Sequence, residues 1–300
     1  MPFPKIIAVV GPTASGKTNW AIQISKALGA PIASFDSRQF YKEMTIGTAK
    51  PSIEELKMAP HAFVNQFSVL DAISAGTFAQ LFNNWMQNQN TSFVVLVGGS
   101  GLYLKSLLFP FHALPNVEAK IRTLVQSEYH EKGLAHLQSR VLALDPVQYL
   151  QMDIQNPQRL MRVLEICLSG YTYSELVAHQ MPAKSPYNYV AIAPLWPRQT
   201  LYQRIDARVE QMMQAGLKEE VKSLLPLAHL PALQTVGYTE LFAYFRSQCS
   251  LEEAIAAIAQ NTRRYAKRQT TWFKNQLPDL VWLDAQSPNS LLEWLQNLKP

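Results

Sequence analysis

Continuous apolar runs along the chain predict buried strands, and amphipathic stretches between them predict helices. The runs cover residues 6–10, 31–35, 93–97 and 189–193, with a last short run at 280–284. Apolar positions at helical spacing occur at 17–28 and 74–88. Continuous apolar strands are typical of parallel sheets that are buried on both faces. Their alternation with helices predicts an α/β fold with a doubly wound parallel sheet.

The pattern changes between residues 115 and 187. Strand-like runs are absent there, and apolar residues recur at helical spacing. We therefore expect a mostly helical insertion at 115–187, within an α/β core formed by 1–114 and 188–300.

The C-terminal part of the chain returns to long helical patterns. A helical series at 198–225 contains a turn at Ala215-Gly216. Ser250 and Glu253 form a capping-box sequence, which predicts the start of a long helix that reaches about residue 274.

The first apolar run leads directly into a phosphate-binding motif, Gly11-Pro12-Thr13-Ala14-Ser15-Gly16-Lys17-Thr18. The motif matches the P-loop pattern G-x-x-x-x-G-K-[ST] in its required setting of strand, glycine-rich turn and helix. Backbone N–H groups of such a loop converge on a polyanion, beside the positive end of the following helix. Lys17 adds a positive charge, and the Thr18 hydroxyl suits Mg²⁺. The motif predicts that the protein binds a phosphate chain, but it does not identify the molecule that carries this chain.

Asp36 follows the second predicted strand, at the carboxyl end where α/β sheets bind ligands. We expect it to face the P-loop, because the ends of neighbouring strands share one crevice. Its carboxylate could accept a proton from a substrate nucleophile; a helix cap or an arginine partner is the alternative. Ser34, Ser37 and Gln39 beside it could read the edge of a base.

The strand at 93–97 ends in glycines. A P-loop ATPase has an Asp there to hold Mg²⁺. This difference favours phosphates that serve as a leaving group over a γ-phosphoryl group that is hydrolysed.

Five basic residues and no acid occur in the stretch 261–274. On a helix, Arg263 and Lys267 lie four residues apart, as do Arg264 and Arg268, and like charges at that spacing repel. We therefore expect this helix to face an anion, with a solvated surface as the alternative. Its aromatic residues could stack on bases or pack the helix onto the core.

Two further arginine pairs are spaced to lie on one helical face. They are Arg159 with Arg162, and Arg204 with Arg208. Either pair could bind a diphosphate, since arginine suits bidentate phosphate contacts. For the second pair, a salt bridge within the helix to Asp206 or Glu210 is the alternative.

Composition narrows the classes of protein. The 300 residues are ample for a sizeable core, and the net charge of +5 is a weak indication of a polyanionic partner. No segment reaches the roughly 18 apolar residues of a membrane span, and the first strand begins too early for a signal peptide. Two cysteines cannot form a disulfide framework, and the six histidines lack zinc-ligand spacing. We expect a cytoplasmic monomer without membrane association.

Eight segments in order along nearly the whole chain resemble the tRNA dimethylallyltransferase family, also called tRNA isopentenyl transferases. The segments are GPTASGKT (11–18), SFDSRQFY (34–41), GTAKP (47–51), VGGSGLY (97–103), QRLMRVLE (158–165), RIDARVEQM (204–212), GYTE (237–240) and TRRYAKRQTTWFK (262–274). Many kinases share the first segment, whereas the last, together with SxDSxQxY and GTAKP, is specific to this family.

The resemblance implies a P-loop NTPase-like fold and a prenyl transfer. In that reaction the N6 amine of the tRNA adenosine next to the anticodon, at position 37, attacks C1 of dimethylallyl diphosphate, and diphosphate leaves. Asp36 matches the catalytic base, and Ser100 stands near the reacting centre where the family usually has Thr. The diphosphate would be held by Mg²⁺ and Arg208 together with Gly11, Thr13, Ala14, Ser15, Gly16, Lys17 and Thr18. Thr18 would be the metal ligand.

By the same resemblance, the helical insertion grips the tRNA anticodon stem-loop, and the target base is extruded into the crevice. The residues expected to contact tRNA are Asp36, Ser37, Arg38, Gln39, Ser100, Lys120, Gln158, Arg159, Arg162, Arg263, Arg264, Lys267 and Arg268.

The chain departs from the family pattern at five positions. Glu43 and Thr45 replace Gly and Asp before GTAKP, Ala62 and Asn65 replace His and Asp, and Asn156 replaces an Asp before the arginine pair. These changes affect the expected loop geometry and tRNA contacts, and they leave the P-loop, Asp36 and the basic helix in place.

Three other functions fit parts of the sequence. An enzyme of the same family could prenylate a free adenine nucleotide, which would need neither the insertion nor the basic helix. A small-molecule kinase would use ATP on the P-loop. A non-catalytic RNA-binding module would bind tRNA without forming a product.

Overall fold

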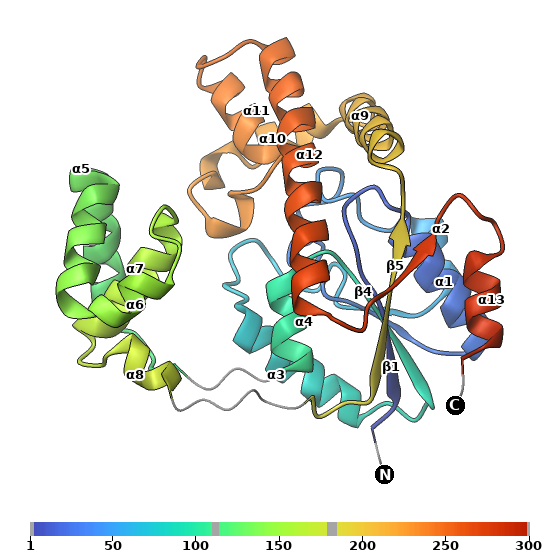
Figure 1. The fold of residues 1–300 in the computed structure, drawn as a ribbon. Helices are drawn as coiled ribbons and strands as arrows, with labels where there is room; N and C mark the ends of the chain where they lie inside the picture. Colours follow the sequence, from blue (N-terminus) through green and yellow to red (C-terminus); the bar gives the residue numbers. More distant parts are fainter. Residues whose placement is uncertain (1–2, 110–113, 179–184, 299–300) are drawn as a thin grey trace. The chain divides into compact units, whose positions relative to one another are not determined.

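The computed structural model describes residues 3–109, 114–178 and 185–298 of the chain. The chain forms two compact units, one made of Met1–Leu108 and Ser185–Pro300 and the other of Phe109–Lys184 (Figure 1). The boundaries expected at residues 115 and 187 stay a prediction, because 110–113 and 179–184 lie outside the described residues.

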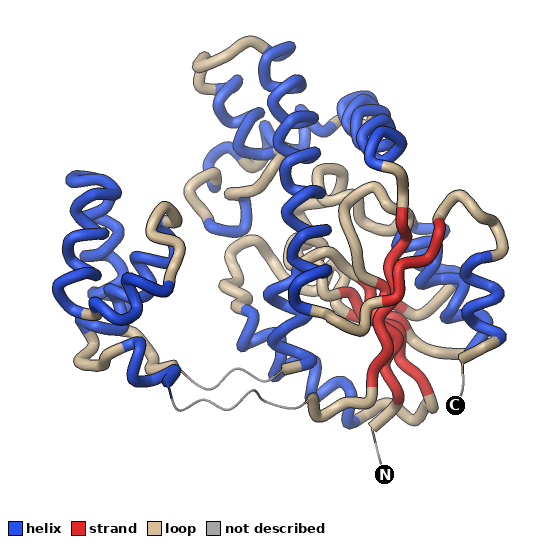
Figure 2. Tube along the Cα trace, viewed as in Figure 1, coloured by secondary structure: helices blue, strands red, loops and turns tan. Residues whose placement is uncertain are grey.

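The first unit is built on one six-stranded parallel sheet (Figure 2), which confirms the predicted fold class. The strand order is β3-β2-β4-β1-β5-β6. The strands are β1 Lys5–Val9, β2 Ile32–Ser34, β3 His61–Ala62, β4 Phe93–Val97, β5 Tyr189–Leu195 and β6 Val281–Asp284.

The central strand β1 is buried on both faces, which explains its continuous apolar run. Ile7 pairs in register with Val95 of β4 and Val190 of β5. On one face, Ile7 and Val9 share a core cluster with residues of α1 (Lys17–Leu28) and α13 (Ser290–Gln296). The other face is covered by α3 (Ala75–Gln87), α4 (Gly101–Leu108) and α12 (Leu251–Gln276), as Figure 1 shows.

Most predicted helices are present, and the additional elements are short. The series at 198–225 consists of α9 (Arg198–Gln214) and α10 (Leu217–Ser223), separated at Gly216, whose φ is 99°. The two-residue strand β3 and the six-residue helix α2 were not predicted, because neither is long enough to show a periodic pattern. The remaining elements of this unit are α2 Ile53–Met58, α11 Tyr238–Phe245 and the 3₁₀ turns Leu225–Leu227 and Pro231–Leu233.

The described residues of the second unit form helices and no strand. The helices are α5 Ala119–Leu144, α6 Pro146–Gln151, α7 Pro157–Leu168 and α8 Tyr173–Ala178. Val125, Leu137 and Val141 of α5 pack against Leu160 and Leu164 of α7. Across the ranges that the structure describes, helices long and apolar enough to cross a bilayer are absent.

Candidate active site

The strand order brings three loops to one edge of the sheet. The P-loop follows β1, the turn at 98–101 follows β4, and the loop at 35–41 follows β2. Strand β4 lies between β1 and β2, so the expectation that β1 and β2 are neighbours is wrong. The chain crosses from β1 past the β4 position to β2 and returns, which a sequence pattern does not reveal. The glycine-rich turn after β4 therefore lies between the P-loop and Asp36.

A cavity of about 190 Å³ opens at this edge. The lining residues that bear on the predictions come from the P-loop, from the end of β2 with its loop, and from the facing 47–51 loop and α9. From the P-loop they are Thr13, Ala14, Gly16, Lys17 and Thr18; from the β2 side they are Ser34, Asp36, Arg38 and Gln39; and from the facing loop and α9 they are Gly47, Thr48, Ala49 and Arg208. Gly11, Ser15, Ser37 and Ser100, which were also predicted, do not line it.

The P-loop is held from outside the motif. Arg204 Nε donates to the Ala14 carbonyl at 2.8 Å, and Trp196 Nε1 donates to the Ser15 carbonyl at 2.9 Å. The Arg204 guanidinium also lies 4.4 Å from the centre of the Trp196 ring. The backbone of the loop is strained, because the non-glycine residue Ala14 has a φ of 62°. The contacts from Arg204 and Trp196 stabilise this conformation. Arg204 thus supports the loop backbone, while Arg208 reaches the cavity.

Lys17, Asp36 and Arg208 interact electrostatically across the cavity. Burial lowers the pKa of Lys17 to about 8, while the Asp36 charge opposes this shift and Arg208 adds to it. The pKa of Arg208 is also lowered by burial, and Asp36 again opposes the shift. Asp36 therefore lies within electrostatic reach of two cations that line the same cavity, and its part in a phosphate site stays a prediction.

Asp36 is held in a tight turn and does not cap a helix. Its Oδ1 accepts from the Arg38 N–H at 3.0 Å, and its own N–H donates to Ser34 Oγ at 3.2 Å. Ser100 supports the same loop, because its hydroxyl accepts from the Ser37 N–H at 3.0 Å and donates to Ser37 Oγ at 3.1 Å. The structure thus assigns Ser100 a supporting contact, and its place at the reacting centre stays a prediction.

The amide of Gln39 joins the Asp36 loop to the GTAKP segment. Its Nε2 donates to the carbonyls of Thr48 at 3.3 Å and Ala49 at 3.2 Å, and its Oε1 accepts from Ser34 Oγ at 3.3 Å. Arg208 donates to the same Ala49 carbonyl at 3.5 Å. The loop at 47–51 therefore closes one side of the cavity.

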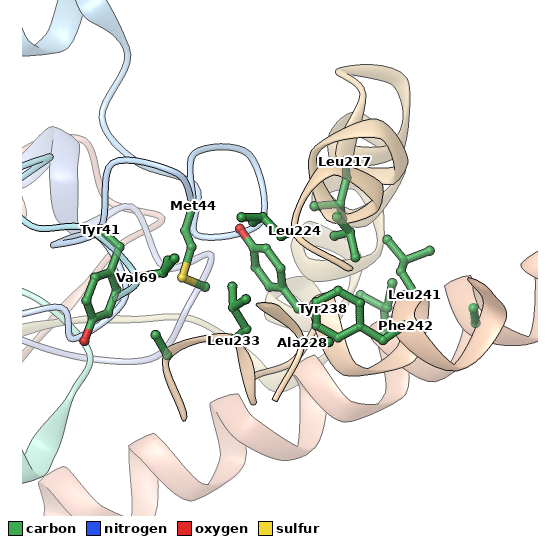
Figure 3. Close-up of a cluster of buried hydrophobic side chains, with 14 of the residues drawn as sticks. Tyr41, Met44, Val69, Leu217, Leu224, Ala228, Leu233, Tyr238, Leu241 and Phe242 are labelled. Atoms are coloured by element: carbon green, nitrogen blue, oxygen red, sulfur yellow. The ribbon is translucent and has the colours of Figure 1, made fainter. Parts of the chain in front are cut away.

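A carboxylate from α10 fixes the start of this loop. Glu220 accepts from the backbone N–H groups of Thr45 at 3.0 Å, Ile46 at 2.8 Å and Gly47 at 3.0 Å, and from the Tyr238 hydroxyl at 2.7 Å. Tyr238 lies in a buried apolar cluster among Met44, Leu233 and Leu241 (Figure 3), and burial raises the pKa of its hydroxyl. Glu220 thus fixes this turn although Thr45 stands where the family pattern has Asp.

Two other departures from the family pattern also have local partners. Lys50 Nζ donates to Asn65 Oδ1 at 2.6 Å and to the Tyr41 carbonyl. Glu43 accepts from Ser68 Oγ at 2.7 Å and from the Val69 N–H at 3.0 Å. Burial lowers the pKa of Lys50 to about 8, although Glu220 and Glu43 oppose the shift.

In the second unit, Asn156 accepts from the Arg159 N–H at 3.2 Å and caps α7. Asparagine and aspartate are equally good at this position, so the helix start survives the replacement. Arg162 pairs with Glu165 at 3.3 Å, and exposed Lys120 pairs with exposed Glu118 at 2.8 Å. The side chains of Gln158 and Arg159 are exposed.

The basic helix α12 has two different faces. Arg263 forms an ion pair with Asp206 of α9, so Asp206 binds a different helix from the one expected. Arg264, Lys267 and Arg268 are exposed and border one surface groove with Trp272. Phe273 is fully buried, and Trp272 meets it edge-on at 5.2 Å between ring centres. These two aromatic residues pack the helix, as the alternative interpretation predicted.

Sequence reasoning missed two groups of residues at the cavity. One is Gln269, a polar residue on the buried face of α12. The other is an apolar wall, whose residues carry no chemical signature and have the spacing of ordinary core positions; it consists of Ile205, Val209, Met212, Val236 and Ile258.

Comparison with known proteins agrees with the resemblance. The sequence profile of the IPP transferase family matches residues 39–276. A tRNA dimethylallyltransferase of Chlorobium chlorochromatii is 42% identical, with 98% of this chain and 97% of that protein covered. One from Christiangramia forsetii is 40% identical, with 97% of each chain covered.

Solved structures show the same likeness. The tRNA isopentenylpyrophosphate transferase of Bacillus halodurans has a TM-score of 0.71 and 31% identity, covering 98% of this chain and 95% of its own. A eukaryotic dimethylallyltransferase acting on tRNA has a TM-score of 0.80 over 98% of this chain and 77% of its own, at 22% identity, which is a likeness of fold alone. From the profile and the relatives, which match over nearly the whole length, we conclude that the chain belongs to the IPP transferase family.

Proposed function

We propose that this enzyme transfers a dimethylallyl group from dimethylallyl diphosphate to N6 of the adenosine next to the anticodon, at position 37 of tRNA. One observation supports this most directly: a single cavity joins the P-loop, Asp36 and an apolar wall. A prenyl diphosphate has one polyanionic end and one apolar end, and this lining offers a surface for each.

The P-loop binds the diphosphate in this proposal. Lys17 and Arg208 face its negative charge, and the start of α1 adds the positive end of a helix. Ser15 Oγ is buried in the loop, outside the cavity lining, and has no hydrogen-bond partner among the described residues. Ile205, Val209 and Met212 of α9 would contact the dimethylallyl carbons.

The site suits a Mg²⁺ ion that is bound partly by the protein and partly by the diphosphate of the substrate. Groups of three acidic, histidine or cysteine side chains that could hold a metal by themselves are absent from the described residues. Mg²⁺ commonly takes one or two protein oxygens together with phosphate oxygens and water, so Thr18 and the diphosphate form a suitable set. When bound, the ion would balance the negative charge of the departing diphosphate.

The reaction requires one proton acceptor. The N6 nitrogen forms a bond to C1 as the bond between C1 and the diphosphate oxygen breaks, and the amine loses a proton. Asp36 accepts that proton, because it is the carboxylate that lines the cavity next to Lys17 and Arg208. The turn that holds Asp36 leaves its second oxygen, Oδ2, for this step.

The exposed cations of α12 and the helical insertion supply the tRNA contacts in this proposal. Arg264, Lys267 and Arg268 present positive charge without a carboxylate partner in the described part of the chain, and such charge binds phosphates. The insertion offers Lys120, Gln158, Arg159 and Arg162. The enzyme would work as a monomer in the cytoplasm, where its two free cysteines stay reduced.

Incubation of the enzyme with labelled dimethylallyl diphosphate and unmodified tRNA tests the proposal. The expected result is label on N6 of the adenosine next to the anticodon, with one diphosphate released for each transfer. Label on free adenine nucleotide in place of tRNA would support the nucleotide-prenylating alternative. Consumption of ATP without prenyl transfer would support the kinase, and tRNA binding without any product would support the RNA-binding module.

A further inference from the structure

Gln269 connects the basic helix to the phosphate-binding loop. It lies on the inner face of α12 and is only 6% exposed. Its Oε1 accepts from the Thr13 N–H at 2.9 Å, and its Nε2 donates to the Gly99 carbonyl at 3.0 Å. One side chain therefore ties the P-loop after β1 to the turn after β4.

The turn after β4 leaves little room for this side chain to move. A Cβ atom at Gly99 would overlap the amide of Gln269, and one at Gly101 would lie 2.5 Å from the Trp272 ring. Helix α12 thus sits directly on the glycine-rich turn, with two side chains one turn apart. The glycines at 99 and 101 allow this close approach.

Gln269 is the side chain that binds the backbone of Thr13 among the described residues. Arg204 and Trp196 bind the carbonyls of Ala14 and Ser15, and Lys17 Nζ donates to the Pro12 carbonyl at 2.6 Å. Thr13 is the intervening residue, and Gln269 fixes its N–H group. Ala14, the next residue, has the left-handed backbone conformation that shapes the loop.

We propose that Gln269 is a positioning residue that holds the P-loop in the conformation that binds diphosphate. Both ends of its amide bind loop backbone, and we assign it no step in the reaction. Its side chain lines the cavity and also meets the Tyr265 hydroxyl, while its two backbone hydrogen bonds go to the two loops at the phosphate site. The identity of the phosphate ligand as a prenyl donor rests on the proposed function.

Two variants separate positioning from general stabilisation. Gln269→Leu removes both hydrogen bonds and leaves the Thr13 N–H and the Gly99 carbonyl unpaired. Gln269→Glu keeps the shape and the bond from Thr13, but at neutral pH its carboxylate faces the Gly99 carbonyl without a donor. We expect the Kd for inorganic diphosphate to rise about 10- to 100-fold in both variants, because a small misplacement of binding groups has effects of this size.

The measurement is calorimetric titration with inorganic diphosphate, alongside the KM for dimethylallyl diphosphate and the Kd for tRNA. Gln260→Leu on the exposed part of the same helix is the control. The expected result is a higher Kd for diphosphate and a higher KM for the donor, with the Kd for tRNA changed less than about threefold. Equal losses in all three quantities, or wild-type diphosphate binding with only a lower Tm, would overturn the proposal.

A pH profile gives a readout that a purely structural role does not move. Protonation of Gln269→Glu restores a donor toward the Gly99 carbonyl, so its diphosphate affinity relative to wild type should improve as pH falls toward about 5. A constant ratio between about pH 5 and 7.5 would contradict the inference. Inorganic diphosphate is used without donor or tRNA, so this result does not depend on prenyl transfer; absence of labelled tRNA with the wild type would overturn the proposed function alone.

Discussion

Arg263 of α12 forms an ion pair with Asp206 of α9. Both residues come from segments rich in cations. Arg263 was expected to contact tRNA, and Asp206 was considered as a salt-bridge partner within its own helix. The pair links two helices that border the cavity, and the Arg263 side chain is only 30% exposed. Of the four cations of α12 that were predicted to contact tRNA, Arg263 is thus the one whose charge is balanced by a carboxylate within the described residues.

This difference predicts an unequal effect on tRNA binding. Replacing Arg264, Lys267 and Arg268 by Gln should lower the steepness of log Kd against log salt by roughly 0.7 to 0.9 for each phosphate that is no longer neutralised. The double variant Arg263→Gln, Asp206→Asn removes the balanced pair without a change of net charge, so its salt dependence should match the wild type. Filter binding over a range of salt concentrations measures both. Equal slopes for the triple variant and the wild type would make the exposed face of α12 structural.

Asp36→Asn should slow turnover by about 10²- to 10⁴-fold with little change in tRNA affinity. The asparagine Oδ1 can still accept from the Arg38 N–H, so the turn keeps its shape while the proton acceptor is removed. Single-turnover product formation and tRNA binding are measured together. Asp284→Asn is a matched control, because exposed Asp284 accepts from the Gln286 N–H at 2.9 Å in a similar turn. Wild-type turnover in Asp36→Asn would exclude Asp36 as the base.

Diphosphate binding should weaken as pH rises through about 8. Burial lowers the pKa of Lys17 to about 8 in the free protein, whereas a bound diphosphate favours the protonated ammonium. Above about pH 8, binding must take up a proton, so log Kd should rise by up to about one for each pH unit.

Calorimetry in buffers of different ionisation enthalpy measures this proton uptake. Inorganic diphosphate also titrates, and the difference between wild type and Lys17→Arg isolates the contribution of Lys17. An identical pH profile in the two proteins would refute the shifted pKa.

Asn65→Asp should stabilise the protein at neutral pH. Lys50 donates to the neutral Asn65 amide, and burial lowers the pKa of Lys50 to about 8. Its charged form is therefore disfavoured in the folded state, so wild-type stability should rise between about pH 8 and the ordinary lysine pKa near 10.5. A carboxylate at 65 would favour the ammonium and flatten that rise. Urea unfolding at about pH 7 and 9.5 measures the free energy of unfolding, with exposed Asn90→Asp as the control. The same change with pH in Asn65→Asp and in the wild type would contradict this prediction.

Asp145 should be critical for the second unit. It is fully buried, and its carboxylate accepts from the Gln148 N–H at 2.9 Å and the Ser174 N–H at 2.8 Å, at the starts of α6 and α8. Asp145→Ala leaves two half-buried donors unpaired, each of which costs at most about 1–3 kcal/mol. We expect faster hydrogen exchange within this unit and weaker tRNA binding, with unchanged diphosphate affinity. Exposed Asp153→Ala is the control; unchanged exchange in Asp145→Ala would contradict this role.

The sequence by itself determined the parts that depend on local pattern. Buried parallel strands appear as continuous apolar runs, and the P-loop is a contiguous segment whose strand, turn and helix can be recognised together. Asp36 could be assigned to a strand end because its position depends only on the strand before it. The family resemblance followed from the order of such segments, and the profile and relatives confirmed it.

Only the tertiary structure decided which distant residues meet. Three such relationships join segments far apart in the chain. They are the position of β4 between β1 and β2, the contact of Gln269 with Thr13 and Gly99, and the pairing of Arg263 with Asp206. A glutamine in a helix has the same local pattern whether it is solvated or buried, and a cation has the same charge whether or not a carboxylate faces it. The packing of α12 on the sheet edge decides whether the glutamine is buried and whether the cation is paired, because each buried polar group requires a partner.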